Sequence, residues 1–231
     1  MWSLRGEFGI TTFLSKLSSF SLPKKKKKII GFGSLTELHL FLFQKWGWKT
    51  IYAPTLTSLA KESWGPSLET IMLKLLHSQY VNIVDEISFL NSASRKKETI
   101  SANIVGGSID FIQKTIGTTW QIHGEGNFLF LEAQNKSIDQ IIGYLHFFKK
   151  SGLFKGVKAL LFGAFPCTHS EENRCILLQT ALESFAAEFN FPIFSNFSVG
   201  HIPNNNPVQI GGQAEIKPIE NAALYKQTIK L

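Results

Sequence analysis

The sequence has few cysteines and no long hydrophobic run, and both absences narrow what the protein can be. Two cysteines among 231 residues cannot cross-link a domain of this size, which is typical of proteins in a reducing compartment. No uninterrupted apolar stretch reaches the roughly 20 residues that a membrane-spanning helix needs. The N-terminus also lacks the ordered basic, apolar and small-residue segments of a signal peptide. We therefore expect a soluble cytoplasmic protein with no membrane partner.

The composition that remains is typical of a packed globular domain. Hydrophobic residues make up 44% of the chain and charged residues 18%, which excludes an intrinsically disordered protein. The net charge is +7, and five of the positive charges form one run, Lys24 to Lys28. Nucleic-acid-binding proteins usually spread basic side chains over a face with interleaved aromatic residues. We interpret the run as a solvated loop and expect no nucleic-acid partner, although an RNA- or membrane-associated module stays open as an alternative.

Helical and strand patterns alternate along the chain. Helical periodicity covers residues 35–45, 68–76, 137–148 and 173–189, and apolar runs at 49–53, 128–132, 157–162 and 192–194 predict strands. This alternation predicts an α/β fold with parallel strands. Apart from its helix, the segment 55–98 is polar and aperiodic. We therefore expect an N-terminal α/β part over 1–60, a linker region over 61–100 and a C-terminal domain over 101–231.

Few residues stand in patterns that carry chemistry. No GxSxG, P-loop or HExxH motif is present, and the spacing of Cys167, His169 and Cys175 fits no zinc site, so we expect no metal or organic cofactor. Glu132 ends an apolar strand, where open α/β sheets bind their ligands, and His201 lies in a turn-rich loop. Such a histidine could be a general base oriented by the glutamate. A surface glutamate and a histidine in a turn are the alternative interpretation.

Several short segments share a further property, because they occur in the order of one known set of motifs. The segments are LRGEFG at 4–9, IIGFGSLTELH at 29–39, GGS at 106–108, FLFLE at 128–132, SID at 137–139 and VGHIPN at 199–204. They resemble, in turn, the ARGGYG, G-[FY]-S-D-x-T-x-L-H, GGNL, FLE, IDR and GHGxxN motifs of the LD-carboxypeptidase family. The resemblance covers nearly the whole chain.

This resemblance implies a serine peptidase that removes the terminal D-alanine from murein tetrapeptides. Such a step belongs to cytosolic peptidoglycan recycling and needs no cofactor, while some relatives hydrolyse peptide–nucleotide antibiotics for self-immunity. The implied fold is an N-terminal α/β lobe with parallel strands and a smaller mixed α/β C-terminal lobe, with a possible homodimer. Carried over by position, His201 is the base, Glu132 orients it, and Ser34 is the candidate nucleophile.

The sequence departs from the family pattern at two positions that bear on activity. Gly33 stands where the family has its serine, and Ser34 occupies the next position, so its side chain is turned by about 100° if the turn is helical. Glu7 replaces a glycine in the turn that would serve the oxyanion. The family's opening strands, which precede that turn, are also absent from this sequence. Two hypotheses follow: a hydrolase that uses Ser34, or a catalytically inactive member or truncated remnant that at most binds peptides.

Overall fold

The computed structural model describes residues 1–231 except 7–8, 61–65, 78–79, 167–171 and 231. The strands are β1 (Ile30–Gly31), β2 (Thr50–Tyr52), β3 (Tyr80–Phe89), β4 (Ile100–Ser108), β5 (Phe128–Glu132), β6 (Ala159–Phe162), β7 (Ile193–Ser195), β8 (Val208–Ile210), β9 (Gly212–Pro218) and β10 (Ala223–Lys230). The α-helices are α1 (Ile10–Leu17), α2 (Thr36–Trp46), α3 (Leu56–Leu59), α4 (Pro66–His77), α5 (Ile109–Thr115), α6 (Ile138–Lys150) and α7 (Glu172–Ala186). Two 3₁₀ helices, η1 (Gly33–Leu35) and η2 (Ser92–Arg95), complete the described elements.

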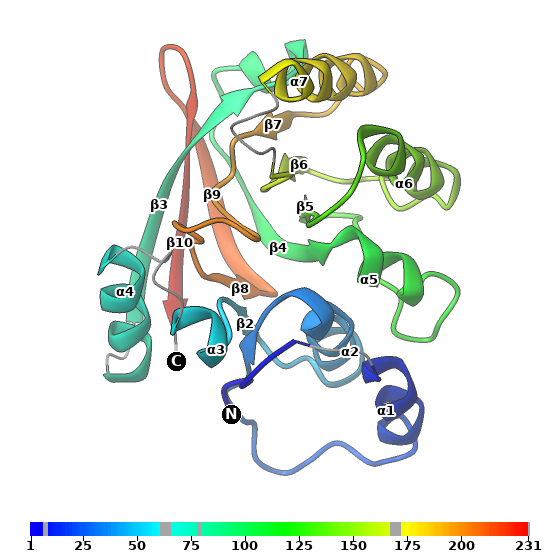
Figure 1. Ribbon diagram of the computed structural model, residues 1–231, viewed down its shortest axis with the longest axis vertical. Helices are drawn as coiled ribbons and strands as arrows, with labels where there is room; N and C mark the ends of the chain where they lie inside the picture. The colour runs from blue at the N-terminus through cyan, green and yellow to red at the C-terminus, as the bar shows by residue number, and fades with distance from the viewer. Residues whose placement is uncertain (7–8, 61–65, 78–79, 167–171, 231) are drawn as a thin grey trace.

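Most of the chain forms a closed seven-stranded barrel in the order β10-β3-β7-β6-β5-β4-β9. The strands from β4 to β7 pair in parallel, and α5, α6 and α7 connect them, as parallel neighbours require. The remaining pairs of the barrel are antiparallel. Figure 1 shows the three connecting helices on one side of the barrel and α4 on the other. The expected α/β fold is therefore confirmed.

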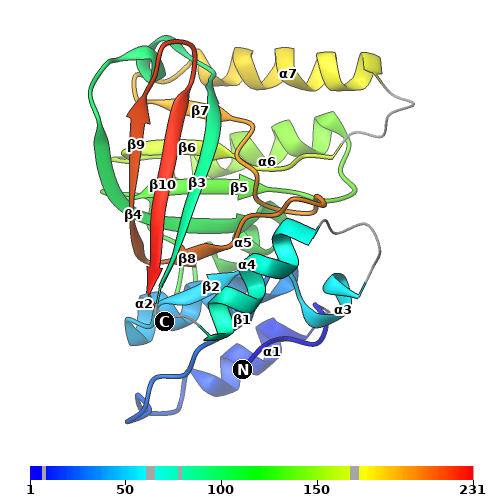
Figure 2. The same cartoon turned by 90° about the vertical axis from the view of Figure 1, so that its left-hand side faces the viewer.

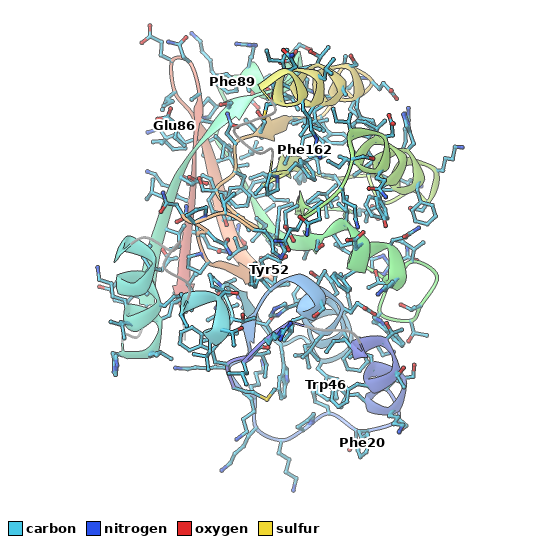
Figure 3. The ribbon with its side chains drawn as sticks, in the orientation of Figure 1. Phe20, Trp46, Tyr52, Glu86, Phe89 and Phe162 are labelled. Carbon is cyan, nitrogen blue, oxygen red and sulfur yellow. The ribbon has the colours of Figure 1, made fainter. Side chains whose placement is uncertain are left out.

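A second, three-stranded sheet lies beside the barrel in the order β1-β2-β8. The strands β1 and β2 are parallel and are joined through α2, whereas β8 pairs antiparallel with β2. Because β8 is followed at once by the barrel strand β9, the two sheets are joined at this point (Figure 2). Figure 3 shows Tyr52, the last residue of β2, at this junction.

Two large apolar cores lie on the two faces of the parallel strands. One fills the barrel and continues into the small sheet, and it includes Ile51 and Phe130. The other lies between the parallel strands and their helices, and it includes Leu129 and Leu131. Successive residues of β5 point to opposite faces, and both faces are buried. This double burial explains why the strand is a continuous apolar run in the sequence.

The segment 61–100, which we expected to be a linker, contains the helix α4 and a ten-residue strand. That strand, β3, pairs with β10 over eight residues and also with β7, so it is part of the barrel wall. Its inward residues Val81, Ile83 and Ile87 are buried and alternate with exposed ones. The polar outward residues make the segment look aperiodic. Within the described part of the chain, no helix has the length and apolarity to cross a membrane.

Candidate active site

The site begins at a sharp turn between β1 and α2. Gly33 follows Phe32 and begins the short helix η1 with φ +63°, in the left-handed region that side chains rarely adopt. A Cβ built at this position would lie 3.5 Å from Nε2 of His201 and 3.8 Å from its Cε1. Position 33 is thus the place on this turn from which a side chain would face the imidazole.

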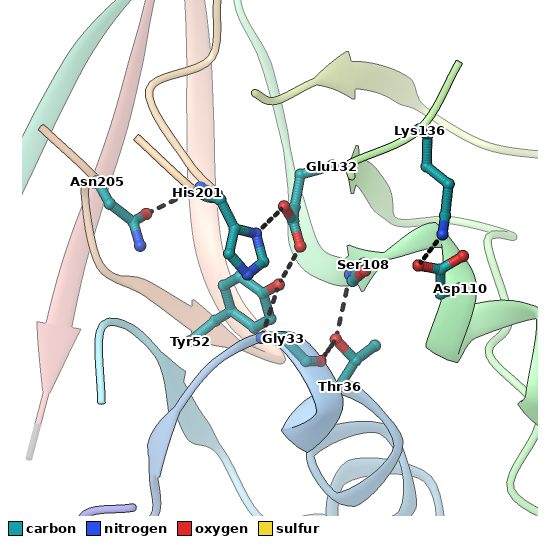
Figure 4. A network of polar contacts seen from close by, with 10 residues as sticks. Gly33, Thr36, Tyr52, Ser108, Asp110, Glu132, Lys136, His201 and Asn205 are labelled. Carbon is teal, nitrogen blue, oxygen red and sulfur yellow. Dashed lines mark hydrogen bonds and ion pairs between the residues drawn. The ribbon is translucent and has the colours of Figure 1, made fainter. Parts of the chain in front are cut away.

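Glu132 and His201 are brought together although 69 residues separate them. Glu132 is the last residue of β5 and is fully buried, and its Oε2 lies 2.8 Å from Nδ1 of His201 (Figure 4). His201 is held on the loop 196–207 between β7 and β8. Its neighbour Gly200 has φ +126°, and a Cβ there would lie 2.9 Å from the glutamate Oε2. Glycine therefore lets the loop approach the carboxylate closely enough for the imidazole to reach it.

A tyrosine from the small sheet completes the environment of the glutamate. The Tyr52 hydroxyl donates to Oε1 of Glu132 at 2.7 Å and accepts a longer hydrogen bond, 3.3 Å, from the backbone N–H of Gly33. Burial raises the pKa of Tyr52 well above its ordinary value, and the neighbouring Glu132 raises it further. The hydroxyl consequently stays protonated and remains a donor. Both oxygens of a fully buried carboxylate are thereby hydrogen-bonded, which offsets the cost of its desolvation.

Thr36 fixes the turn from its other side. Its Oγ1 donates to the carbonyl oxygen of Gly33 at 2.6 Å and accepts from the backbone N–H of Ser108 at 3.1 Å. Ser108 ends β4, the parallel neighbour of β5, in register with Glu132. The turn that carries position 33 is therefore tied to the same edge of the barrel that carries the glutamate.

Ser34 does not share this arrangement. Its side chain is buried, and its Oγ has no hydrogen-bond partner among the described residues. The Oγ atom lies 3.2 Å from the place where a Cβ of Gly6 would stand, so it is directed toward the 4–6 segment. The structure thus brings Glu132 and His201 together but gives Ser34 no hydrogen bond to His201 within its described part. Glu7, the other departure from the family pattern, lies outside the described residues.

A lysine follows the same strand end in the sequence. Lys136 comes four residues after Glu132, and its Nζ lies 3.0 Å from Oδ2 of Asp110, in the first turn of α5 (Figure 4). Both side chains are about a quarter exposed, at 22% and 25%, so this ion pair is open to solvent. Of the cysteine and histidine set weighed as metal ligands, Cys167 and His169 lie outside the described residues, and Cys175 is an exposed thiol on α7.

Sequence reasoning missed four side-chain or backbone groups of this site. They are Tyr52, Thr36, Ser108 and Lys136. Tyr52 had a usable signal, because a tyrosine ending a short buried strand needs a partner for its hydroxyl. The others are recognised only once the fold has placed their elements side by side.

The amino-acid sequence of the chain matches one protein family. The model of the LD-carboxypeptidase C-terminal domain matches residues 101–216, half of the chain, so the chain belongs to the LD-carboxypeptidase family. It is 34% identical over 209 residues to a protein of Rickettsia prowazekii (strain Madrid E) named as a candidate carboxypeptidase. The match covers 90% of this chain but only 64% of that relative, so the chain spans less than two thirds of its length.

Solved structures share the fold at lower sequence identity. The muramoyltetrapeptide carboxypeptidase from Oxalobacter formigenes superposes with a TM-score of 0.69 at 17% identity, covering 87% of this chain and 68% of that one. A mutant of the microcin C7 self immunity protein MccF, in complex with adenosine monophosphate, gives a TM-score of 0.69 at 20% identity, with 89% and 68% covered. At these identities the likeness establishes the fold.

Proposed function

We propose that this chain is a peptide-binding member of the LD-carboxypeptidase family in which serine acyl transfer does not operate. The observation that carries the proposal is the geometry at position 33. That position faces Nε2 of His201 at 3.5 Å from a built Cβ, and it is occupied by a glycine. The neighbouring hydroxyl, on Ser34, is directed toward Gly6 instead.

The site lacks the hydroxyl group at position 33 that serine acyl transfer would need. There His201 would take the hydroxyl proton, and Glu132 would stabilise the imidazolium through Nδ1, with Tyr52 holding the glutamate in place. Without a hydroxyl, no ester bond to the scissile carbonyl can form at this position. The imidazole can still donate a hydrogen bond to, or accept one from, a peptide bound beside the turn.

The ligand class we propose is a murein peptide that ends in a D-amino acid. The protein would bind it in the cytoplasm, as a monomer or as a homodimer. Family membership supports this class, as does the name of the Oxalobacter formigenes structure. A terminal carboxylate calls for a cation, and Lys136 supplies one near the strand end that carries Glu132. Because Asp110 already pairs with Lys136 at a partly exposed site, the ligand carboxylate would compete with it.

The proposal is tested with purified wild type, Ser34→Ala and His201→Ala on a tetrapeptide ending in diaminopimelate-D-Ala or L-Lys-D-Ala. Calorimetry measures binding, and mass spectrometry measures released D-alanine. We expect wild type and Ser34→Ala to bind alike and to release no D-alanine. Turnover that Ser34→Ala abolishes would show that Ser34 is the nucleophile after all. Turnover that survives Ser34→Ala but not His201→Ala would show direct attack by water, so the chain would be an enzyme and not only a peptide-binding protein. Either result contradicts the proposal.

The cation is tested separately. Lys136→Ala should weaken binding of the tetrapeptide about tenfold, the loss expected for one charge-assisted hydrogen bond. Lys150→Ala, at the exposed end of α6, is the matched control and should bind as wild type does. Equal affinities of Lys136→Ala and Lys150→Ala would remove Lys136 from the site.

A further inference from the structure

We infer that Asp85 is a positioning residue that clamps the two ends of the loop 196–207 and so holds His201 against Glu132. The inference rests on the proposed role of the His201–Glu132 pair, but it does not depend on whether the chain hydrolyses peptides. Asp85 lies in β3, far from the turn that carries Gly33 in sequence, and nothing in its own strand marks it for a polar task.

Asp85 faces the interior of the barrel. It stands between the inward residues Ile83 and Ile87 and pairs across the sheet with Tyr225 of β10. The Tyr225 ring is fully buried, its hydroxyl has no hydrogen-bond partner in the described part of the chain, and its centroid lies 4.7 Å from that of Phe197. A carboxyl group in such apolar surroundings is costly, so it calls for partners.

The hydrogen-bond partners of Asp85 lie near the two ends of the loop 196–207. Oδ2 accepts from the backbone N–H of Ser198 at 2.7 Å, and the Asn206 side chain lies near enough to lower the pKa of Asp85. The backbone N–H of Asn206 donates to the carbonyl oxygen of Ser198 at 2.7 Å. These contacts hold residues 198 and 206, near the two ends of the loop, together. His201 lies between these two residues.

A carboxylate suits this task because both of its oxygens accept hydrogen bonds. Burial raises the pKa of Asp85, and the contacts with Ser198 and Asn206 lower it, so the same contacts that fix the loop also offset the desolvation of the charge. An amide at this position would keep one acceptor for Ser198 but would lose the second.

Other bonds hold parts of the loop but do not replace the clamp. The carbonyl oxygen of Val199 accepts a hydrogen bond from the N–H of Ala164 at 2.8 Å. This bond connects the beginning of the loop to the segment that follows β6. The N–H of Gly200 donates to Oδ1 of Asn205 at 2.9 Å, and this bond lies within the loop itself. Loss of Asp85 should therefore make the two ends of the loop more mobile and displace His201, while the barrel stays folded.

The experiment is NMR on the full chain with labelled histidine, comparing wild type, Asp85→Asn, Asp85→Ala and Glu86→Gln. Glu86 is the matched control, since it is the next residue of β3 and is exposed on the outer side of the barrel (Figure 3). The readouts are exchange of the Nδ1 proton of His201 with water and the midpoint of its titration. We expect exchange at least about tenfold faster in Asp85→Ala, a smaller increase in Asp85→Asn, and no change in Glu86→Gln.

Circular dichroism melts show which variants are folded at the temperature of the NMR measurement. If Asp85→Ala fails to fold, Asp85→Asn decides the question. Unchanged exchange and titration of His201 in every folded Asp85 variant would overturn the inference. Wild-type turnover of a tetrapeptide bears only on the proposed function, so the two can fail separately.

In a Gly33→Ser background that hydrolyses the tetrapeptide, Asp85→Ala should lower kcat by about tenfold to a hundredfold and leave KM within about twofold, because misplacing a base slows chemistry more than binding. A loss confined to KM would contradict a positioning role.

Discussion

Gly33 and Ser34 are adjacent in the chain, but the geometry of the turn directs their side-chain positions to different places. Position 33, the first residue of η1, has φ +63° and faces His201, whereas the Ser34 side chain is directed toward Gly6. A side chain at position 33 costs on the order of 1 kcal/mol in backbone strain, which strand-to-helix turns that carry a nucleophile tolerate. A glycine here relieves that strain and also removes the reacting atom.

Tyr52 allows a prediction at the same scale. Tyr52→Phe removes the donor to Oε1 of Glu132 and leaves a buried carboxylate oxygen without its partner. We expect the free energy of unfolding to fall by about 1–3 kcal/mol, measured by urea titration. Tyr80→Phe, at an exposed tyrosine of β3, is the control and should change stability little. Equal effects of the two substitutions would show that the hydrogen bond to the glutamate does not matter for stability.

Among the elements, α2 is tied to both short parallel strands by one buried histidine. His39 Nε2 lies 2.9 Å from the carbonyl oxygen of Gly31 in β1, and Nδ1 lies 2.8 Å from Oγ1 of Thr50 in β2. Since a carbonyl only accepts, Nε2 carries the proton and Nδ1 accepts from the threonine. The turn at Gly33 is therefore braced by a neutral imidazole.

This bracing makes stability depend on pH. Burial lowers the pKa of His39 from 6.5 to about 4, so between these values the unfolded chain binds a proton that the folded chain does not. The stabilisation is fully present above pH 6.5 and is lost as the pH falls toward 4, at up to about 1.4 kcal/mol per pH unit. Urea titrations should show this slope in wild type and in His123→Gln, an exposed control, but not in His39→Gln. The same slope in all three proteins would refute the assignment.

The elements that sequence patterns predict are those with a strong apolar signal, either a continuous apolar run or a helical period. The strand expected over 128–132 is β5 itself, and the helices expected over 35–45 and 137–148 match α2 and α6 within about two residues at each end. The strand β3 and the antiparallel strands β9 and β10 escaped notice, because their polar outer residues dilute the apolar signal. The candidate site follows the same rule: a strand end in the sequence points to Glu132, whereas Asp85 has meaning only once the barrel has closed.

Across the whole molecule, one apolar core joins the small sheet to the barrel. Ile30, Ile51 and Tyr52 of the small sheet belong to the same buried cluster as the barrel interior. The Phe130 ring of β5 packs edge-on against the Tyr52 ring, with centroids 5.2 Å apart. The site lies where these two sheets meet, so its geometry depends on both being folded.

This shared core predicts one cooperative unfolding transition. Tryptophan fluorescence reports mainly on the region of α2 and the small sheet, where Trp46, the last residue of α2, packs against Trp48. Far-ultraviolet circular dichroism reports on the whole chain. We expect the two signals to give the same urea midpoint. A fluorescence midpoint clearly below that of circular dichroism would show that the small sheet melts independently of the barrel.

The central claim is that position 33, and not Ser34, faces the histidine, and one labelling measurement tests it most directly. A small fluorophosphonate reacts with an activated serine and needs no peptide-binding subsite, so mass spectrometry after labelling reads the geometry alone. We predict that wild type is not labelled, that Gly33→Ser is labelled at position 33, and that His201→Ala in that background slows labelling at least about 100-fold. Labelling of wild type at Ser34, or labelling of Gly33→Ser that does not depend on His201, would contradict the account.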